Sequence, residues 1–417
     1  MLYRLTRLLL RGALSQFFAG IRVTGAPRLE HGPVLLVGNH PNLALDSLVI
    51  GAVFERELWY LAKSTLFRNP ILARLLRALH VIPVYRRQDN PDDMSQNAET
   101  FRRAAERLAA GAAVVVFPEG VSRGERKLAP IRTGAARIGF AAEEAAGFTL
   151  GVRIQPVGLT YSELGLFRSS VTVRVGVPIE VGAGRGEFEA DALAAVRKLT
   201  AAIEEGLREV TVELADSHQQ ILVEKIARLY RSRGSTLDDL ERLTLIGRNV
   251  EAVSAAQPGV RSGLERRIDE YLALASLFML EEGGLLDRPR EPLWTAFLLP
   301  LVVLGFLLHY LPYRIVGRMV AGASPVALAS QKLGYGLLIF SLWYALLAGS
   351  AGLLWGGAAL FLTLGVLLVS GFAVNNYLHH ARLLLLAALW PGKRNPIQVL
   401  AMVRDELIGD LERLRVV

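Results

Sequence analysis

Residues 34–46 read Val-Leu-Leu-Val-Gly-Asn-His-Pro-Asn-Leu-Ala-Leu-Asp, and this stretch decides the fold expected of the chain. It begins with Val34–Val37, an apolar run of strand-forming residues that ends at Gly38. From Ala44 onward the sequence is typical of an apolar helix. His40 is therefore predicted to lie in the connection between a strand and a helix.

The pairing of His40 with Asp46 depends on Pro41. Two residues six apart in one helix, at ~100° per residue, lie about 120° apart and cannot meet. Pro41 disfavours the helical conformation at His40, and Asn42 is expected to cap the helix by accepting from its first free amides. A histidine oriented by a carboxylate can take a proton from a hydroxyl near neutral pH. The pair thus predicts general-base chemistry on an alcohol, with a loop histidine that merely bonds to a nearby helix as the alternative.

The composition indicates a membrane protein. Of the 417 residues, 52% are hydrophobic, the mean hydropathy is +0.34, and the excess is concentrated after residue 290. The formal net charge of +8 suits anionic lipid surfaces or phosphorylated substrates. No run of basic residues interleaved with aromatics is present, so nucleic acid is not expected as a partner. The absence of cysteine excludes disulfides and cysteine metal sites.

The first half of the chain is predicted to be an α/β domain behind an N-terminal helix. Residues 1–30 are expected to form a basic amphipathic helix lying on a membrane, with a helix packed on the next domain as the alternative. Residues 31–186 alternate short strands with helices, which predicts a mixed sheet flanked by helices. No glycine-rich phosphate loop follows a strand, so no nucleotide cofactor is expected. The expected strands are 34–37, 58–62, 81–85, 113–117, 154–161 and 171–177, and the expected helices are 43–54, 66–79, 92–110 and 130–146.

Two further segments are predicted to be helical and charged. Residues 187–290 are rich in alanine and leucine with helical spacing, and they are interpreted as a helical accessory region of unassigned role. Breaks between its helices are expected at 231–235 and 257–262. Residues 382–417 are expected to form a basic C-terminal helix.

The membrane region is predicted over 291–381. Residues 334–374 carry no charge, and one straight helix of that length would run about 60 Å, twice a bilayer core, so a hairpin turning near 349–352 is expected. Positive charge flanks both ends of the hairpin, which puts those ends on one membrane face. The α/β domain is predicted to lie on the cytoplasmic face. If the ends of the hairpin lie on that same face, residues 293–313 cannot cross the membrane. This stretch is expected to be a re-entrant or interfacial segment broken at Pro300, with a third span as the alternative.

Polar and charged residues gather behind the expected strands, where open α/β sheets bind their ligands. Arginines follow the strand ending at 85, and an acidic and basic cluster follows the strand ending at 117. No metal-ligand spacing occurs among the histidines. Besides His40 and Asp46, the candidate site residues are Asn39, Arg86, Arg87, Glu119, Gly120, Ser122, Arg123 and Arg132.

Four ordered motifs resemble the glycerolipid acyltransferase superfamily, whose members acylate glycerol 3-phosphate, dihydroxyacetone phosphate or lysophosphatidate. They are Asn39-His40 with Asp46, Phe117-Pro118-Glu119-Gly120, Thr133-Gly134-Ala135-Ala136-Arg137 and the later Pro156. The resemblance covers roughly residues 30–180. It implies that His40 is the base, Asp46 its orienting partner, Arg86 or Arg87 a phosphate contact, and Glu119 with Gly120 part of the acceptor site.

This sequence departs from most of the superfamily in two ways. Five residues, 41–45, separate the histidine from the aspartate where four are usual. The longer spacing resembles a branch of membrane-bound glycerol 3-phosphate and dihydroxyacetone phosphate acyltransferases with an apolar C-terminal region. Arg123 stands where that branch often has histidine, so its role is open.

The chain is accordingly expected to be an integral membrane acyltransferase of phospholipid synthesis. It would move a fatty acyl chain from acyl-CoA or acyl carrier protein to the hydroxyl of glycerol 3-phosphate or dihydroxyacetone phosphate, without a metal or other cofactor. Backbone amides near the start of the 43–54 helix are expected to stabilise the oxyanion. The alternatives are acylation of lysophosphatidate or another lysolipid and, in a different class, a non-catalytic membrane protein that binds lipid. A lipid esterase is disfavoured because no Gly-x-Ser-x-Gly motif occurs.

Overall fold

A computed structural model describes residues 2–25, 32–86, 89, 95–230, 237–278, 297–389 and 396–415. The chain forms two compact units. The first comprises residues 1–213 together with 325–330, and the second comprises 214–324 and 331–417. Each is described by itself.

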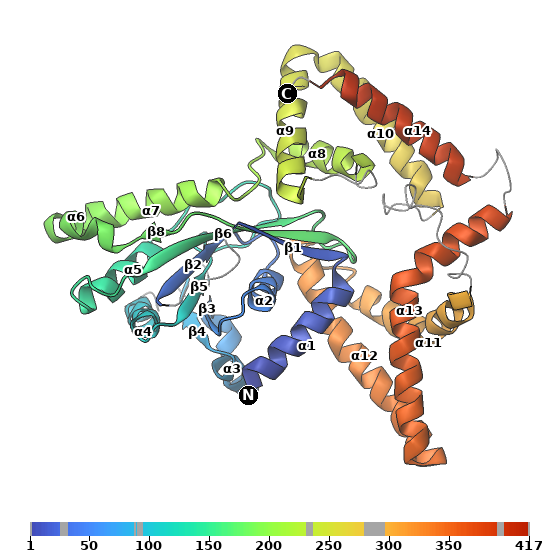
Figure 1. Ribbon diagram of the computed structural model, residues 1–417, viewed down its shortest axis with the longest axis horizontal. Coiled ribbons are helices and arrows are strands. Elements are labelled where there is room, and N and C mark those ends of the chain that lie inside the picture. The colour runs from blue at the N-terminus through green and yellow to red at the C-terminus, as the bar shows by residue number, and fades with distance from the viewer. Residues whose placement is uncertain are drawn as a thin grey trace. The chain divides into compact units, whose positions relative to one another are not determined.

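The first unit is built on a mixed sheet flanked by helices, as the sequence predicts (Figure 1). The sheet has eight strands. The strand order is β1-β7-β6-β2-β5-β3-β4, with β8 paired to β6. The central strand β2 is parallel to both β5 and β6, whereas β7 and β8 run antiparallel to β6. The strands are β1 (Gly20–Gly25), β2 (Val34–Gly38), β3 (Leu58–Lys63), β4 (Val81–Val84), β5 (Ala113–Val116), β6 (Arg153–Tyr161), β7 (Ser170–Val175) and β8 (Ile179–Glu180).

All six expected strands are present, and two strands were not expected. One of these, β1, pairs in parallel with β7 at the edge of the sheet, so residues 20–25 belong to the sheet and not to an N-terminal helix. Its side chains are mostly exposed or half-buried, because an edge strand has fewer neighbours, and it therefore carries no strong apolar signal. The other, β8, has only two residues.

Helices cover both faces of this sheet (Figure 1). Leu35 and Val37 of β2 share a buried cluster with α4, α5 and α7, and because strand side chains alternate, Val34 and Leu36 face the other side. The helix α7 adds Ile203 and Leu207 to this core, so the unit extends to residue 213 and beyond the expected boundary at 186. The helices are α1 (Leu2–Phe17), α2 (Ala44–Val53), α3 (Pro70–Ala78), α4 (Asn97–Ala109), α5 (Gly134–Ala145), α6 (Arg185–Ala190) and α7 (Ala192–Arg208).

The N-terminal helix α1 packs on α2 (Figure 1). Arg11 Nε donates to the Ala52 carbonyl at 2.7 Å, and Arg7 donates to the carbonyls of Phe54 and Glu55. These arginines therefore satisfy the carbonyl groups at the end of α2, where a helix favours positive charge. The alternative prediction, a helix packed on the next domain, is confirmed for the face of α1 that contacts α2. Its other side leaves an apolar stripe exposed: Leu5, Leu8 and Leu9.

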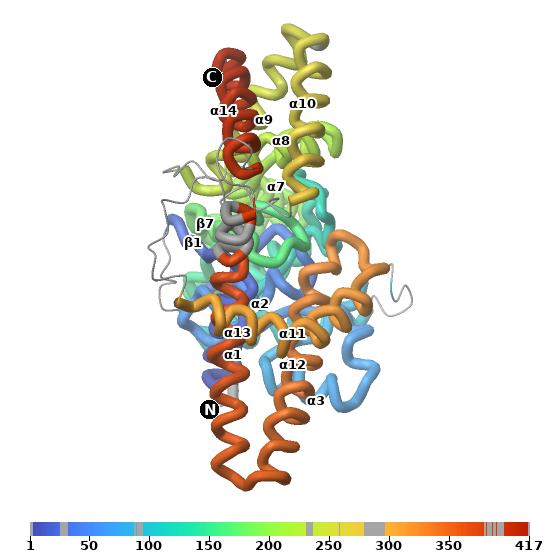
Figure 2. Tube along the Cα trace, turned by 90° about the vertical axis from the view of Figure 1, so that its right-hand side faces the viewer, coloured from blue at the N-terminus to red at the C-terminus, as the bar shows by residue number. Residues whose placement is uncertain are grey.

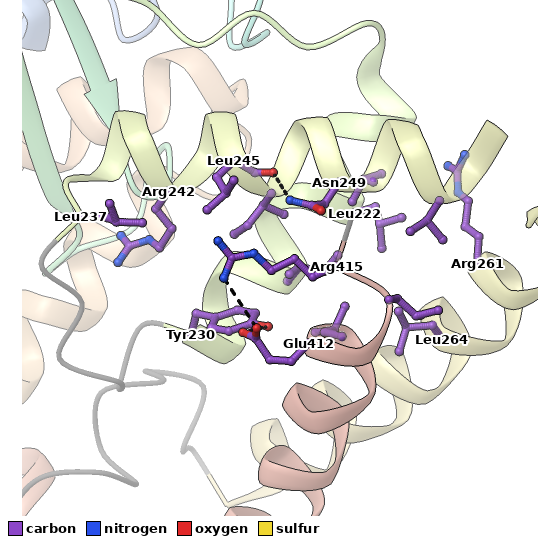
Figure 3. A pocket seen from close by; sticks show the side chains of 16 residues that line it. Leu222, Tyr230, Leu237, Arg242, Leu245, Asn249, Arg261, Leu264, Glu412 and Arg415 are labelled. Carbon is purple, nitrogen blue, oxygen red and sulfur yellow. Dashed lines mark hydrogen bonds and ion pairs between the residues drawn. The ribbon is translucent and has the colours of Figure 1, made fainter. Parts of the chain in front are cut away.

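Four helices of the second unit surround a cavity of about 450 Å³ (Figure 3). They are α8 (Ser217–Tyr230), α9 (Asp239–Ala256), α10 (Pro258–Leu277) and α14 (Pro396–Arg413). Arg267 of α10 holds α14 through ion pairs with Glu406 and Asp410. The expected break at 257–262 is only the junction of α9 and α10 at Gln257, and the break at 231–235 lies outside the described residues. None of the predicted site residues lines this cavity.

Within the described part of the chain, three helices are long and apolar enough to cross a membrane: α11 (Leu299–Met319), α12 (Pro325–Trp355) and α13 (Gly357–Leu389), the last over Gly357–Leu378. The helices α12 and α13 are joined at one end (Figure 2). The predicted hairpin is present, but its turn is at Gly356 and not at 349–352. Gly356 ends α12 with a φ of 90°, which favours glycine, whereas Gly352 lies inside α12 and leaves room for Leu360.

The helix α11 is continuous, and the expected break at Pro300 is wrong. Pro300 lies in the first turn, where proline is tolerated because its missing N–H would have no helical partner. The helix crosses α13 and does not run alongside it (Figures 1 and 2). Gly305 meets the backbone of Ser370 at this crossing, with no room for a Cβ. Length and composition allow the third span that was the alternative, and the re-entrant or interfacial placement of this segment stays a prediction.

Candidate active site

The carboxyl ends of three neighbouring strands form the candidate site. Because β2 is parallel to β5 and β6, these strands end at the same edge of the sheet. His40 follows β2, Glu119 follows β5, and Tyr161 is the last residue of β6. Asn39 joins two of the strands, since its side chain donates to the Leu159 carbonyl at 3.1 Å and accepts from the Leu159 N–H at 2.7 Å.

The side chains of His40 and Asp46 meet, as the sequence predicts. His40 Nδ1 lies 2.8 Å from Asp46 Oδ2, and the carboxylate is fully buried while the histidine side chain is 19% exposed. The imidazole stacks on Phe117 with ring centroids 4.1 Å apart and an angle of 13° between the planes. Because the carboxylate holds Nδ1, Nε2 is the ring nitrogen that can exchange a proton with a bound molecule.

Asp46 has two further partners that fix its position. Oδ2 also accepts from the Asn42 N–H at 2.7 Å, and Oδ1 accepts from the Tyr161 hydroxyl at 2.7 Å. Burial, together with the Asp46 charge, raises the pKa of Tyr161 well above its ordinary value, so the phenol remains a donor. Sequence analysis missed Tyr161; the one signal was its place at the end of an expected strand beside the predicted site.

Glu119 supports the backbone of the histidine loop. Its Oε1 accepts from the His40 N–H at 2.8 Å and its Oε2 accepts from the Ala129 N–H at 2.9 Å. Burial raises the pKa of this carboxyl, and the two amide donors act in the opposite direction. Both carboxylate oxygens are thus engaged by backbone groups, and a direct contact of Glu119 with the acceptor stays a prediction.

Ser122 holds the same loop at two points. Its Oγ donates to the His40 carbonyl at 2.6 Å and accepts from the Leu43 N–H at 3.0 Å. The Arg123 N–H also donates to the His40 carbonyl, at 3.2 Å. These bonds hold Leu43 at a φ of 48°, a conformation that costs a non-glycine residue about 1–3 kcal/mol and persists only where the surroundings enforce it.

Asn42 does not cap α2, which corrects the expectation from the sequence. The helix begins one residue later than an Asn42 cap requires, and its N-cap position is Leu43. The Asn42 side chain is buried, and its Oδ1 has no hydrogen-bond partner among the described residues. The Leu45 N–H donates instead to Ser330 Oγ at 3.1 Å and to the Asn42 backbone carbonyl at 3.2 Å.

The amides at the start of α2 are therefore already in use. Asn42, Leu43 and Leu45 donate to the side chains of Asp46, Ser122 and Ser330, respectively. These three N–H groups were among the expected donors to an oxyanion. Their bonds to protein oxygens make them part of the scaffold of the loop.

Arg123 and Lys127 line a small cavity beside His40. Both side chains are exposed, and the cavity, which Asn39 and Leu159 also line, measures about 30 Å³. This volume is about that of one water molecule, so a larger ligand would extend beyond it along the surface. Arg123, Arg126 and Lys127 outnumber Glu119 and Glu125 among the lining residues, and this excess of positive charge suits an anionic ligand.

Two other predicted arginines, Arg86 and Arg132, lie around Gly120. The Arg86 guanidinium pairs with Asp89 at 2.5 Å and donates to the Gly120 carbonyl at 3.2 Å. Gly120 has a φ of 67°, and a Cβ there would lie 2.9 Å from Arg132 Nε, so a larger residue would be strained and would displace the Arg132 side chain. Arg87 lies outside the described residues.

Comparisons with known proteins agree with this architecture. Residues 20–160 match the family model described as Acyltransferase. Glycerol-3-phosphate O-acyltransferase 2 of Saccharomyces cerevisiae is 34% identical over 136 residues, which are 32% of this chain and 18% of the yeast protein. Glycerol-3-phosphate O-acyltransferase 1 of the same organism is 32% identical over 142 residues, 33% of this chain and 18% of that protein. The chain thus spans about a fifth of the length of these curated relatives.

A solved structure is also similar in part. The crystal structure of the 1-acyl-sn-glycerophosphate (LPA) acyltransferase PlsC from Thermotoga maritima matches 49% of this chain and 78% of its own, with 19% identity and a TM-score of 0.35.

Proposed function

Because residues 20–160 match the Acyltransferase family model, we propose that this chain is an O-acyltransferase of the glycerolipid type that acts on glycerol 3-phosphate or dihydroxyacetone phosphate. The donor is an acyl thioester of coenzyme A or acyl carrier protein. The observation that carries the proposal is the imidazole of His40, held by the buried Asp46 at 2.8 Å beside exposed basic side chains. Both yeast relatives are named as glycerol-3-phosphate O-acyltransferases, which supports that acceptor.

In the proposed reaction His40 is the general base. Its Nε2 takes the proton of the acceptor hydroxyl while that oxygen attacks the thioester carbonyl carbon. The tetrahedral intermediate then breaks its carbon–sulfur bond, and the imidazolium returns the proton to the leaving sulfur. Asp46 keeps the ring in one tautomer and stabilises its charged form. A thioester already has a good leaving group, so positioning the hydroxyl and removing its proton are most of the task.

The acceptor phosphate is proposed to lie against Arg123 and Lys127. Both are exposed and line the cavity that contains His40, so a phosphate bound by them would keep the acceptor hydroxyl near the imidazole. Arg86 is a weaker candidate than the sequence suggested, because Asp89 and the Gly120 carbonyl already engage its guanidinium. Arg132, which packs over Gly120, stays a candidate because its side chain is exposed.

The catalytic domain is proposed to face the cytoplasm. Arginine and lysine flank both ends of the α12–α13 hairpin, as the positive-inside rule requires of cytoplasmic segments. The chain has no cysteine, so Glu187→Cys in exposed α6 gives a single reactive thiol. Labelling by a membrane-impermeant maleimide in inside-out but not right-side-out vesicles is the expected result, and the reverse pattern would contradict this orientation.

The proposed activity is tested with the purified full chain in detergent micelles and a labelled acyl donor. Glycerol 3-phosphate, dihydroxyacetone phosphate and lysophosphatidate are offered in turn, each with acyl-CoA and with acyl carrier protein, and the products are identified. We expect esterification of one of the first two acceptors. Transfer to lysophosphatidate alone would favour the lysolipid alternative, and no transfer to any acceptor would favour a non-catalytic lipid-binding protein.

A further inference from the structure

The start of α2 lacks a side-chain cap from its own segment, although the Leu45 N–H makes a 3.2 Å backbone turn bond to the Asn42 carbonyl. No nearby side chain accepts from its first amides, although the helix carries Asp46 in its first turn and directly follows the histidine loop. An uncapped helix start next to catalytic groups would leave the loop free to change conformation, because such caps are worth about 1 kcal/mol. The structure meets this need from a distant part of the chain.

Ser330 supplies the missing cap. Its Oγ accepts from the Leu45 N–H at 3.1 Å and donates to the Asn42 carbonyl at 2.9 Å. The N–H of the same Asn42 donates to Asp46 Oδ2, the oxygen that holds His40 Nδ1. The Ser330 hydroxyl is thus linked through Asn42, by two hydrogen bonds, to the carboxylate that orients the imidazole.

Ser330 is held in place because its own segment packs within the first unit. Residues 325–330, the first turns of α12, belong to that compact unit. Val326 packs at Gly124, where a Cβ would lie 3.2 Å from its Cγ2, and Leu328 packs at Gly165, where a Cβ would lie 2.9 Å from its Cδ2. Ala329 is buried. The position of the hydroxyl is therefore fixed by side-chain packing as well as by its hydrogen bonds.

We propose that Ser330 is a positioning residue for acyl transfer. The inference rests on the function proposed above and extends it. The hydroxyl closes the histidine loop against α2, so the pair of His40 and Asp46 takes its reactive geometry only while the first turns of the apolar helix α12 are seated on the α/β unit. The membrane region then has a role in catalysis beyond anchoring, because it contributes a side chain to the support of the loop.

A matched pair of variants isolates the hydroxyl. Ser330→Thr keeps it, Ser330→Val has nearly the same shape without it, and Ser341→Ala removes an exposed serine elsewhere in α12. We expect Ser330→Val to lower kcat about tenfold, with KM for the acceptor within about twofold of wild type, since the loss of a hydrogen-bonding hydroxyl at a half-buried site is of this size. Ser330→Thr and Ser341→Ala should stay within about twofold of wild type in both constants.

Hydrogen exchange gives a readout that does not require activity. In Ser330→Val the amides of residues 42–46 should exchange about tenfold faster, while those of β5 exchange as in wild type. A general loss of stability would instead accelerate exchange in β5 as well, which would contradict the proposal. Should Ser330→Val fail to insert, Ser330→Ala is measured in its place.

The outcomes separate the two proposals. Equal kcat in Ser330→Val and Ser330→Thr would overturn the positioning role whatever the acceptor is. If the wild-type chain acylates none of the acceptors, the proposed function fails, and exchange alone decides whether Ser330 supports the loop. Faster exchange confined to residues 42–46 would then uphold the cap, and unchanged exchange would refute it.

Discussion

Two histidines in different regions of the molecule show how partners decide what an imidazole can do. His40, in the loop after β2, has Nδ1 on a buried carboxylate, and none of the described residues bonds to its Nε2. His309, in the apolar helix α11, has Nδ1 2.7 Å from the Gly305 carbonyl and Nε2 2.8 Å from the Tyr344 hydroxyl. Both nitrogens of His309 are engaged by neutral groups and its side chain is buried, so it joins helices. In His40, by contrast, Nε2 is available for proton transfer, and Nδ1 is paired with the charged carboxylate of Asp46.

The strongest test of this contrast is a double-mutant cycle on His40 and Asp46. His40→Ala should lower kcat by about 10²–10⁴-fold, the usual contribution of a general base. Asp46→Asn should lower it by a similar factor, because the amide cannot stabilise the imidazolium. The double variant should be little worse than His40→Ala, since the two residues act as a unit. Steady-state kinetics on the full chain measures all three, and additive losses would break the assignment.

Substitution of Glu119 should lower kcat less, and it should also change how the stability of the protein depends on pH. Glu119→Gln should lower kcat about tenfold, because a glutamine amide can accept from only one of the two backbone amides that Glu119 binds. Glu143→Gln is the matched control, since Glu143 is another buried glutamate that accepts from two backbone amides, those of Leu150 and Val152. It should lose stability and keep kcat.

The pH dependence of stability follows from the raised pKa of Glu119. Burial makes the folded state hold this proton more tightly than the unfolded state does. The stabilisation is therefore full below the ordinary pKa of 4.5 and is lost as the pH rises through the raised value. The Tm of wild type minus that of Glu119→Gln should decline with rising pH in that window and then level off. A difference that rises with pH would contradict the burial argument.

Tyr161 should contribute less than the pair that it supports. Tyr161→Phe leaves the buried Oδ1 of Asp46 without its phenolic donor, and we expect kcat to fall about three- to tenfold with a loss of about 1–3 kcal/mol in stability. Tyr60→Phe removes the hydroxyl of a half-buried tyrosine in β3 and should lower stability without changing kcat. Equal kcat in the two variants would mean that Tyr161 is only a core residue.

The smallest effect on catalysis is expected at His309. His309→Ala removes the link between α11 and Tyr344 and opens space at the crossing with α13, so the Tm in micelles should fall. Acyl transfer per folded molecule should stay within about twofold of wild type. A loss of kcat comparable to that of His40→Ala would erase the contrast between the two histidines.

Local patterns predicted the parts of the molecule that local physics fixes. Apolar runs such as Val34–Val37 mark strands whichever partner they pair with, and an uncharged stretch of 41 residues must fold back on itself in a bilayer. Pro41 separated His40 from the helix, so the meeting of His40 with Asp46 could be foreseen. The motifs around Glu119 pointed to the correct edge of the sheet.

Only the tertiary structure decided how that edge is supported. The cap of α2 comes from Ser330, 285 residues beyond Leu45, and the second partner of Asp46 comes from Tyr161, 115 residues away. Asn42 has the right residue type and position for a cap, yet Leu43 is held at a positive φ and the helix begins after it. The sequence by itself thus determined that His40 and Asp46 meet, because their types and spacing are local. The fold determined which residues, distant in sequence, hold them in place. A hydrogen bond between such residues depends on their distance in space, which cannot be read from their separation along the chain.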